Sequence, residues 1–415
     1  MHVARSICHA GVFAALSASS VSAQSASNTA ATKSSGLAEI VVTARLRTEN
    51  AETIAGSLSV VGPQMLERPY TVNTQELSQL VPSLNYSSAN PRNTAFTIRG
   101  LGSSLVAVSQ ANDGLEPGVG FYVDQVYHAR PATAASDFTD IERVEVLRGP
   151  QGTPFGKNST AGAISITSRE PIFQPEASEE ISVGNLGFVQ AKAQVSGPIA
   201  TEKLAFRLAV QTTERDGVIH NTLTNVDENN VANQAIRGQL LYEPEDSFKI
   251  RLIVDYANFN STCCTQVYVR VAPTLKTAAR QYPGLIAGLP APYAGYAPPS
   301  LDPYARKSNI DAALGVNTDE GGVEALIDKD LGFATLTSIS AWRFWDWDAA
   351  NDRDYTGLPI QATQHIPRAR TSTARRSAWP PTARNVRATS PASTIFIKRS
   401  PANRSRSTDR WWPTI

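Results

Sequence analysis

The stretch "VLRGPQGTPFGKNSTAGAISI" (Val146–Ile166) places four glycines between two short apolar runs. A phosphate-binding loop of the Walker A type requires a glycine, four residues and then Gly-Lys-Ser/Thr, because its backbone N–H groups surround the phosphate. Gly156-Lys157 is present, but Gln151 stands where the first glycine is required and Asn158 follows the lysine. The dinucleotide-binding spacing Gly-x-Gly-x-x-Gly fails as well. The reason for these glycines must therefore come from the rest of the chain.

Composition excludes several function classes for the 415-residue chain. Its 38 Lys and Arg nearly balance its 37 Asp and Glu, so no global charge favours a nucleic-acid partner. The five histidines are scattered, and neither an HExxH nor a CxxC pattern occurs. We therefore expect no enzyme, no catalytic residue, no metal site and no cofactor. Because no apolar run reaches the roughly 18 residues of a membrane helix, any membrane crossing would use strands.

The N-terminus indicates export. Residues 1–23 combine Arg5, the apolar run "AGVFAALSA" and a small-residue cleavage site ending at Ala23, which is typical of a signal peptide. Residues 24–48 follow, and the small polar residues 24–36 are expected to be disordered. "LAEIVVTARLR" (Leu37–Arg47) is an isolated β-prone segment. It is either the edge strand of the next domain or a strand kept free for a partner sheet to pair with.

Residues 49–171 mix predicted short strands and helices, as in a compact α/β domain. "GSLSVVGPQMLE" predicts a strand, a turn and a helix start. In "NTQELSQLVPSLN" the leucines Leu77, Leu80 and Leu84 have helical spacing, and Pro82 ends the helix. "FTDIERVEVLRGP" predicts a turn of helix before a strand at Val144–Leu147, and "AGAISITS" predicts the next strand.

Residues 172–365 change to alternating strands of about ten residues, of which we expect about seven. Such strands match the thickness of a bilayer and favour an outer-membrane β-barrel, with a soluble β-sandwich as the alternative. The segment Asn260–Glu320 is rich in Pro, Tyr and Ala and fits a long extracellular loop. At its start, the adjacent cysteines Cys263 and Cys264 form either a disulfide or two free thiols.

Four segments within residues 37–365 resemble the TonB-dependent outer-membrane receptors. "DIERVEVLRGPQGTPFGKNSTAGAISITSREP" (Asp140–Pro171) is similar to the family's plug signature, and it is long enough to make chance a poor explanation. "FTIRGLG" (Phe96–Gly102) and "VGFYVDQVY" (Val119–Tyr127) resemble plug strands. "EIVVTA" (Glu39–Ala44) resembles the TonB box.

The resemblance implies an α/β plug domain followed by the first antiparallel strands of a large transmembrane β-barrel. It implies an outer-membrane location in a Gram-negative bacterium, with outer-membrane lipid and TonB as partners and no nucleic acid. The ligand would be a small-molecule iron complex such as a ferric siderophore, with haem, cobalamin or saccharides as alternatives. TonB would grip the box by strand addition; the box comprises Glu39, Ile40, Val41, Val42, Thr43 and Ala44.

Inside a plugged barrel the glycines would allow tight turns and close approach to a neighbouring backbone. The plug arginines could pair with carboxylates on the barrel wall, or form only weak surface ion pairs. The plug-motif residues singled out are Arg99, Gly100, Arg143, Arg148, Gly149, Gly152, Gly156, Gly162 and Arg169.

Residues 366–415 depart from the family pattern. They are rich in arginine and proline and lose strand alternation, which favours an out-of-frame end over a basic nucleic-acid or lipid-binding tail. About seven strands are too few to close a barrel around a plug. We therefore expect a C-terminally truncated receptor that does not transport, with a plug-type ligand-binding or signalling fragment as the alternative.

Overall fold

The computed structural model describes residues 41–42, 49–50, 56–66, 74–88, 94–102, 117–128, 139–156, 158–352, 354–360, 364–374 and 393–399. All of them belong to one compact unit, Val41–Ile415. The predicted signal peptide and most of residues 24–48 lie outside the described residues. Among the described residues, none of the helices is long and apolar enough to cross a bilayer.

The plug is built on a five-stranded mixed sheet in the order β3-β8-β9-β6-β7, in which only β6 and β9 run parallel. A separate hairpin pairs β4 with β5. The strands are β3 (Ser57–Val61), β4 (Leu84–Ser88), β5 (Thr94–Ile98), β6 (Val119–Val123), β7 (Val126–Tyr127), β8 (Ile141–Arg148) and β9 (Gly162–Ser168). The short helices are α1 (Pro63–Leu66), η3 (Thr74–Glu76), α2 (Leu77–Leu80) and α4 (Gly152–Phe155).

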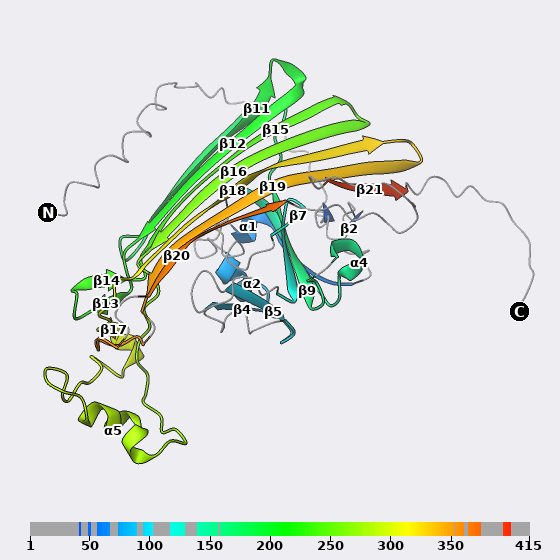
Figure 1. Cartoon of the computed structure of the whole chain (residues 1–415). Coiled ribbons are helices and arrows are strands. Elements are labelled where there is room, and N and C mark those ends of the chain that lie inside the picture. Colours follow the sequence, from blue (N-terminus) through cyan, green and yellow to red (C-terminus); the bar gives the residue numbers. More distant parts are fainter. Residues whose placement is uncertain are drawn as a thin grey trace, which may run out of the picture. The chain divides into compact units, whose positions relative to one another are not determined.

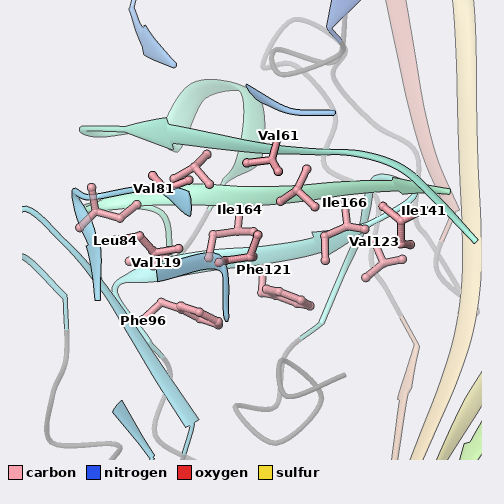
Figure 2. Packing of buried hydrophobic residues seen from close by; sticks show 14 of the residues in the cluster. Val61, Val81, Leu84, Phe96, Val119, Phe121, Val123, Ile141, Ile164 and Ile166 are labelled. Carbon is pink, nitrogen blue, oxygen red and sulfur yellow. The ribbon is translucent and has the colours of Figure 1, made fainter. Parts of the chain in front are cut away.

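One hydrophobic cluster holds these elements together (Figure 2). Val144, Val146 and Ile164 on the central strands are fully buried. Phe96 of β5 and Phe121 of β6 stack with ring centroids 6.1 Å apart, which joins the hairpin to the main sheet.

One local prediction in the plug is wrong. The expected helical turn before Val144 is strand, because β8 starts at Ile141 and pairs with β3 on one side and β9 on the other. There, sheet pairing overrides a helical pattern in the local sequence. The predicted end of the short helix at Pro82 is confirmed, since α2 ends at Leu80 and Leu84 begins β4, where it pairs with Ile98.

The remaining large sheet has nine antiparallel strands, and Figure 1 shows them side by side. Their order is β10-β11-β12-β15-β16-β18-β19-β20, with β21 also pairing with β19. The strands are β10 (Glu176–Val183), β11 (Val189–Ile199), β12 (Thr201–Arg215), β15 (Val231–Glu245), β16 (Phe248–Ser261), β18 (Gly315–Asp330), β19 (Ala334–Asn351), β20 (Gln364–Ala374) and β21 (Ser393–Arg399). The predicted combination of an α/β plug with antiparallel barrel-type strands is confirmed. Several strands, of 14 to 18 residues, exceed the expected ten.

The large sheet has one apolar and one polar face. A row across five strands, Leu208–Gly238–Val254–Val323–Trp342, is held in direct register. Its four side chains are large, apolar and 40–54% exposed. The neighbouring row, Arg207–Gln239–Ile253–Glu324, is buried and largely polar. Apolar residues facing out and polar residues facing in are the pattern of an outer-membrane strand sheet.

The two ends of the large sheet differ. Short turns join β11 to β12, β15 to β16 and β18 to β19. Long connections lie at the other end, where β13 (Ile219–Asn221), β14 (Val226–Glu228), β17 (Lys307–Ser308), η6 (Ala278–Arg280), α5 (Tyr282–Ala287) and η7 (Pro303–Ala305) are found (Figure 1). Cys263 and Cys264, at the start of the longest connection, are joined by a disulfide. Long loops mark the extracellular side of outer-membrane barrels.

Within the described residues the sheet does not close, since β10 forms one edge and β20 and β21 the other. β20 pairs with the second half of β19 and β21 with the first half. The register of β20 shifts between Ala369 and Ile366, where Pro367 cannot donate a backbone hydrogen bond. Residues 366–374 therefore form a paired strand despite their lack of alternation. The out-of-frame origin of the tail stays a prediction.

Candidate functional site

Two plug aspartates contact the polar face of the large sheet, which we call the wall. Asp124 lies in the two-residue turn between β6 and β7, where Asp124 and Gln125 have φ values of 45° and 69°. Asp140, just before β8, has a φ of 55°. Short polar residues such as Asp enter this left-handed region more readily than most. Both carboxylates therefore come from sharp backbone turns.

Arg207 of β12 binds Asp140 through two hydrogen bonds. Its Nε donates to Oδ2 at 2.5 Å and its Nη2 donates to Oδ1 at 2.7 Å. The two side chains are 2% and 5% exposed. A guanidinium matches a carboxylate in this two-point geometry, so the contact fixes orientation as well as distance.

Arg251 of β16 makes the second contact between wall and plug. Its Nη2 donates to Ser168 Oγ at 2.7 Å and to Gln239 Oε1 at 2.7 Å, and its Nη1 lies 3.6 Å from Asp124 Oδ1. Asp124 also accepts hydrogen bonds from the backbone N and the hydroxyl of Ser168, at 3.0 and 2.7 Å. Burial alone would raise the pKa of Asp124, but Arg251, Arg237 and Ser168 together hold that pKa below its ordinary value. The carboxylate therefore stays charged at neutral pH.

Further wall side chains complete this interface. Gln239 donates to the carbonyl of Arg169 at 3.0 Å, and Lys249 donates to Glu170 at 2.6 Å. Breaking a buried ion pair by removing one partner costs about 3–5 kcal/mol, because the other charge is left without compensation. The interface is therefore more sensitive to losing one partner than to losing both.

The predicted plug arginines have other partners. Arg148 donates to Ser57 Oγ at 2.7 Å, to Ser83 Oγ at 2.8 Å and to Ser59, and Arg99 donates to Ser57 Oγ at 3.2 Å. Both arginines thus hold β3, the edge strand that follows the N-terminal segment.

Arg143 pairs with plug residues, reaching Glu142 at 2.5 Å and Glu145 at 2.8 Å. In the contacts described above, the wall supplies the arginines and the plug supplies the carboxylates. That plug arginines pair with wall carboxylates, or form only weak surface ion pairs, stays a prediction. A signal in the sequence could have found the two wall arginines, because Arg207 in "FRLAV" and Arg251 in "IRLIV" are charged residues inside strongly apolar strands. The interface residues that sequence reasoning missed are Asp124, Asp140, Ser168, Arg207 and Arg251.

The glycines of the plug motif have two distinct roles. Gly149 has a φ of +86°, which a side chain resists, and it turns the chain after β8. A Cβ on Gly162 would lie 2.3 Å from the carbonyl oxygen of Leu147 and 2.5 Å from Ile98 Cδ1, so this glycine permits close approach of β9 to β8. Gly100 follows β5, Gly152 begins α4 and Gly156 ends it.

The predicted TonB box is described only at Val41 and Val42. These residues form β1 and pair with Glu49 and Asn50 of β2. Glu39, Ile40, Thr43 and Ala44 lie outside the described residues, so the box stays a prediction. In the part of the chain that the structure describes, no three His, Cys, Asp or Glu side chains form a ready metal cage.

Comparison with known proteins supports the family-level reading. Residues 50–163 match the model of the TonB-dependent Receptor Plug Domain. The pesticin receptor of Yersinia pestis is 31% identical over 182 residues, which cover 44% of this chain and 26% of the receptor. An iron-regulated outer membrane virulence protein of Vibrio cholerae is 26% identical over 189 residues, covering 43% of this chain and 28% of that protein.

Solved structures share the fold. The crystal structure of the ferric yersiniabactin uptake receptor from Yersinia pestis has a TM-score of 0.59 and 21% identity over 72% of this chain and 42% of the receptor. The ferripyoverdine receptor of Pseudomonas aeruginosa has a TM-score of 0.57 and 13% identity over 79% of this chain and 39% of the receptor.

These findings confirm the resemblance to TonB-dependent receptors and, at the level of the family, the predicted outer-membrane location. Three of these four proteins are named receptors: the pesticin receptor, the ferric yersiniabactin uptake receptor and the ferripyoverdine receptor. The matched region spans about a quarter of the length of the curated relatives.

Proposed function

We propose that this chain carries the plug domain and wall strands of a TonB-dependent receptor whose function is the active uptake of a ferric siderophore across the outer membrane. The observation that carries the proposal is the two-faced wall. Its apolar face suits lipid, and its polar face holds the plug through Arg207 and Arg251. A plug bound by a few polar contacts can block a pore and still be released.

The ligand class follows from the relatives. The ferric yersiniabactin uptake receptor and the ferripyoverdine receptor are named for iron complexes, and the plug and wall strands of this chain share their fold. The ligand would meet the protein at the end of the sheet that carries the long connections. TonB would pair with residues 39–44 and pull on the segment leading to β3, the edge strand of the plug sheet.

Replacing Val41 by proline tests the predicted TonB box. Proline removes a backbone donor and fixes φ, so it should prevent strand addition by the partner. We expect the full chain carrying Val41→Pro to lose binding to the purified C-terminal domain of TonB. It should keep its affinity for the cognate ferric siderophore, which is first selected from a panel by its binding to the unaltered chain. The measurements are pull-down from detergent extracts and quenching of intrinsic fluorescence.

Thr32→Pro, in the polar segment before the box, is the matched control and should bind TonB normally. If Val41→Pro still binds TonB, the box is wrongly placed. If the unaltered chain binds TonB but none of the ferric siderophores, the proposed ligand class is wrong while the family-level mechanism stands.

A further inference from the structure

The longest connection of the large sheet contains a lobe, residues 266–307, whose two ends meet at one buried carboxylate. Glu228 Oε2, at the end of β14, accepts a hydrogen bond from Ser308 Oγ at 3.1 Å and another from Thr265 Oγ1. Glu228 Oε1 accepts from Asn221 Nδ2 at 2.7 Å, which ties the carboxylate to β13. Glu228, Thr265 and Ser308 are all buried. The neck of the lobe is therefore closed and fixed to the β13–β14 hairpin.

Both ends of the lobe are held at further points. Asn229 Oδ1 accepts from the backbone N of Thr265, and Asn229 Nδ2 donates to the Thr265 carbonyl, each at 2.9 Å. Tyr296, inside the lobe, donates from its hydroxyl to Asn309 Oδ1 at 2.9 Å, just beyond the other end. These contacts hold the lobe in a defined place at the end of the strands.

The lobe is strongly basic. Its only acidic residue is Asp302, whose carboxylate caps η7. The basic side chains are all exposed, and among the described residues none of them forms an ion pair. These basic residues are Arg270, Lys276, Arg280, Arg306 and Lys307. Exposed cations without neighbouring acids favour an anionic partner.

The same lobe exposes large apolar side chains. Leu275 and Tyr304 are almost fully accessible to solvent, and Leu275 directly precedes the basic Lys276. The exposed apolar set is Val269, Val271, Leu275, Leu285, Leu301 and Tyr304. A single exposed apolar residue needs no explanation. Several of them interleaved with basic residues are typical of segments that bind the surface of a membrane.

The place of the lobe in the fold indicates which membrane surface this is. The connection that contains the lobe joins β16 to β18, whose Val254 and Val323 belong to the exposed apolar row of the wall. The neck lies at the end of the sheet with the long connections, which is the extracellular side. The leaflet that surrounds these strands on that side therefore borders the neck, and its phosphorylated headgroups carry the charge that complements the lobe.

We propose that residues 266–307 bind the phosphorylated headgroups of glycolipids in the outer leaflet of the outer membrane. The basic side chains contact phosphate, the apolar side chains enter the headgroup layer, and Glu228 holds the lobe at the rim of the wall. One basic residue near an anionic leaflet strengthens binding about fivefold. Because 1 M salt shortens the Debye length to about 3 Å, binding should be much weaker at high salt. The proposal depends on the outer-membrane location and not on which ligand is transported.

Trypsin cleavage of the full chain in mixed micelles of a non-ionic detergent tests the proposal. The sites in the lobe are Arg270, Lys276, Arg280 and Arg306. Bis-phosphorylated lipid A, added to the micelles at low salt, should slow cleavage there about tenfold or more, and 1 M NaCl should restore the rate. Dephosphorylated lipid A, phosphatidylcholine and inorganic phosphate should give no protection.

Variants of exposed side chains, which leave the fold intact, give a second readout through the anisotropy of fluorescently labelled lipid A. Lys276→Gln combined with Arg280→Gln should weaken binding about 25-fold, and Leu275→Ser should weaken it at low and high salt alike.

Two controls should bind as the unaltered chain does. Lys203→Gln removes a charge next to the short turn after β11, and Leu223→Ser changes an exposed apolar residue between β13 and β14. Unchanged affinity of the double variant, or protection of the lobe by any of the phosphate-free lipids or by inorganic phosphate, would overturn the proposal. So would protection by a ferric siderophore in place of lipid A, since the lobe would then belong to the ligand site.

Discussion

Substituting methionine for Arg207 should release the plug from the wall. The change leaves the Asp140 carboxylate buried without its partner, at a cost of about 3–5 kcal/mol. We expect the undocked population to rise by roughly two to three and a half orders of magnitude, since about 1.4 kcal/mol corresponds to a factor of ten. The measurement is the rate of trypsin cleavage after the plug residues Arg143 and Arg148 in the full chain.

Two further variants interpret that result. The double variant Arg207→Met with Asp140→Asn should recover most of the protection, because neither charge is then left unpaired. Lys192→Met is the control on the neighbouring strand β11. It removes only a partly exposed ion pair, in which Lys192 Nζ lies 4.0 Å from Glu180 Oε1, so the cleavage rate should change little. An Arg207→Met chain as resistant as the unaltered protein would show that the Asp140 contact does not hold the plug.

Gly162→Ala should disrupt the plug sheet. The added Cβ would lie 2.3 Å from the Leu147 carbonyl oxygen, and this atom cannot move without displacing β8. Overpacking of a rigid backbone costs about 3 kcal/mol or more in the worst cases. Hydrogen exchange of the β8 and β9 amides in the full chain should accelerate accordingly.

Two other glycines of the same motif provide a graded comparison. Gly149→Ala meets no neighbouring atom but has a φ of +86°, so it should cost about 1–2 kcal/mol. Gly152→Ala has open space and an ordinary φ at the start of α4, so it should be neutral or slightly stabilising. A different order of the three effects would contradict the geometry assigned to this motif.

The sequence predicted what depends on local pattern. The glycine-rich motif around Gly149 and Gly162 indicated the plug, and alternation along strands such as those of Leu208 and Val254 favoured outer-membrane barrel strands. It could not predict that Arg207 meets Asp140, because the two residues are 67 positions apart and belong to different sheets. The helical turn predicted before Val144 was wrong for a related reason. Glu142 and Arg143 suit a helix in the local sequence, but the pairing of β8 with β9 places this segment, from Ile141 on, in a strand.

The central claim is that the plug docks on the polar face of the wall, and a cysteine cross-link tests it most directly. Thr139 of the plug and Gln211 of β12 are both buried, and Thr139 Oγ1 donates to Gln211 Oε1 at 3.3 Å. The pair Thr139→Cys and Gln211→Cys removes none of the charged contacts. In the control, Ser57→Cys takes the place of Thr139→Cys. Thr139 lies just before Ile141, the first residue of β8, whereas Ser57 pairs with Arg148, the last residue of β8. The rise of the strand separates Ile141 and Arg148 by about 23 Å.

Outer-membrane fractions containing the full chain would be treated with a short bifunctional thiol reagent, and the linked peptides identified by mass spectrometry. The account predicts an efficient link between positions 139 and 211 and none between positions 57 and 211. Absence of the first link, or equal yields for the two pairs, would contradict a plug docked on this wall.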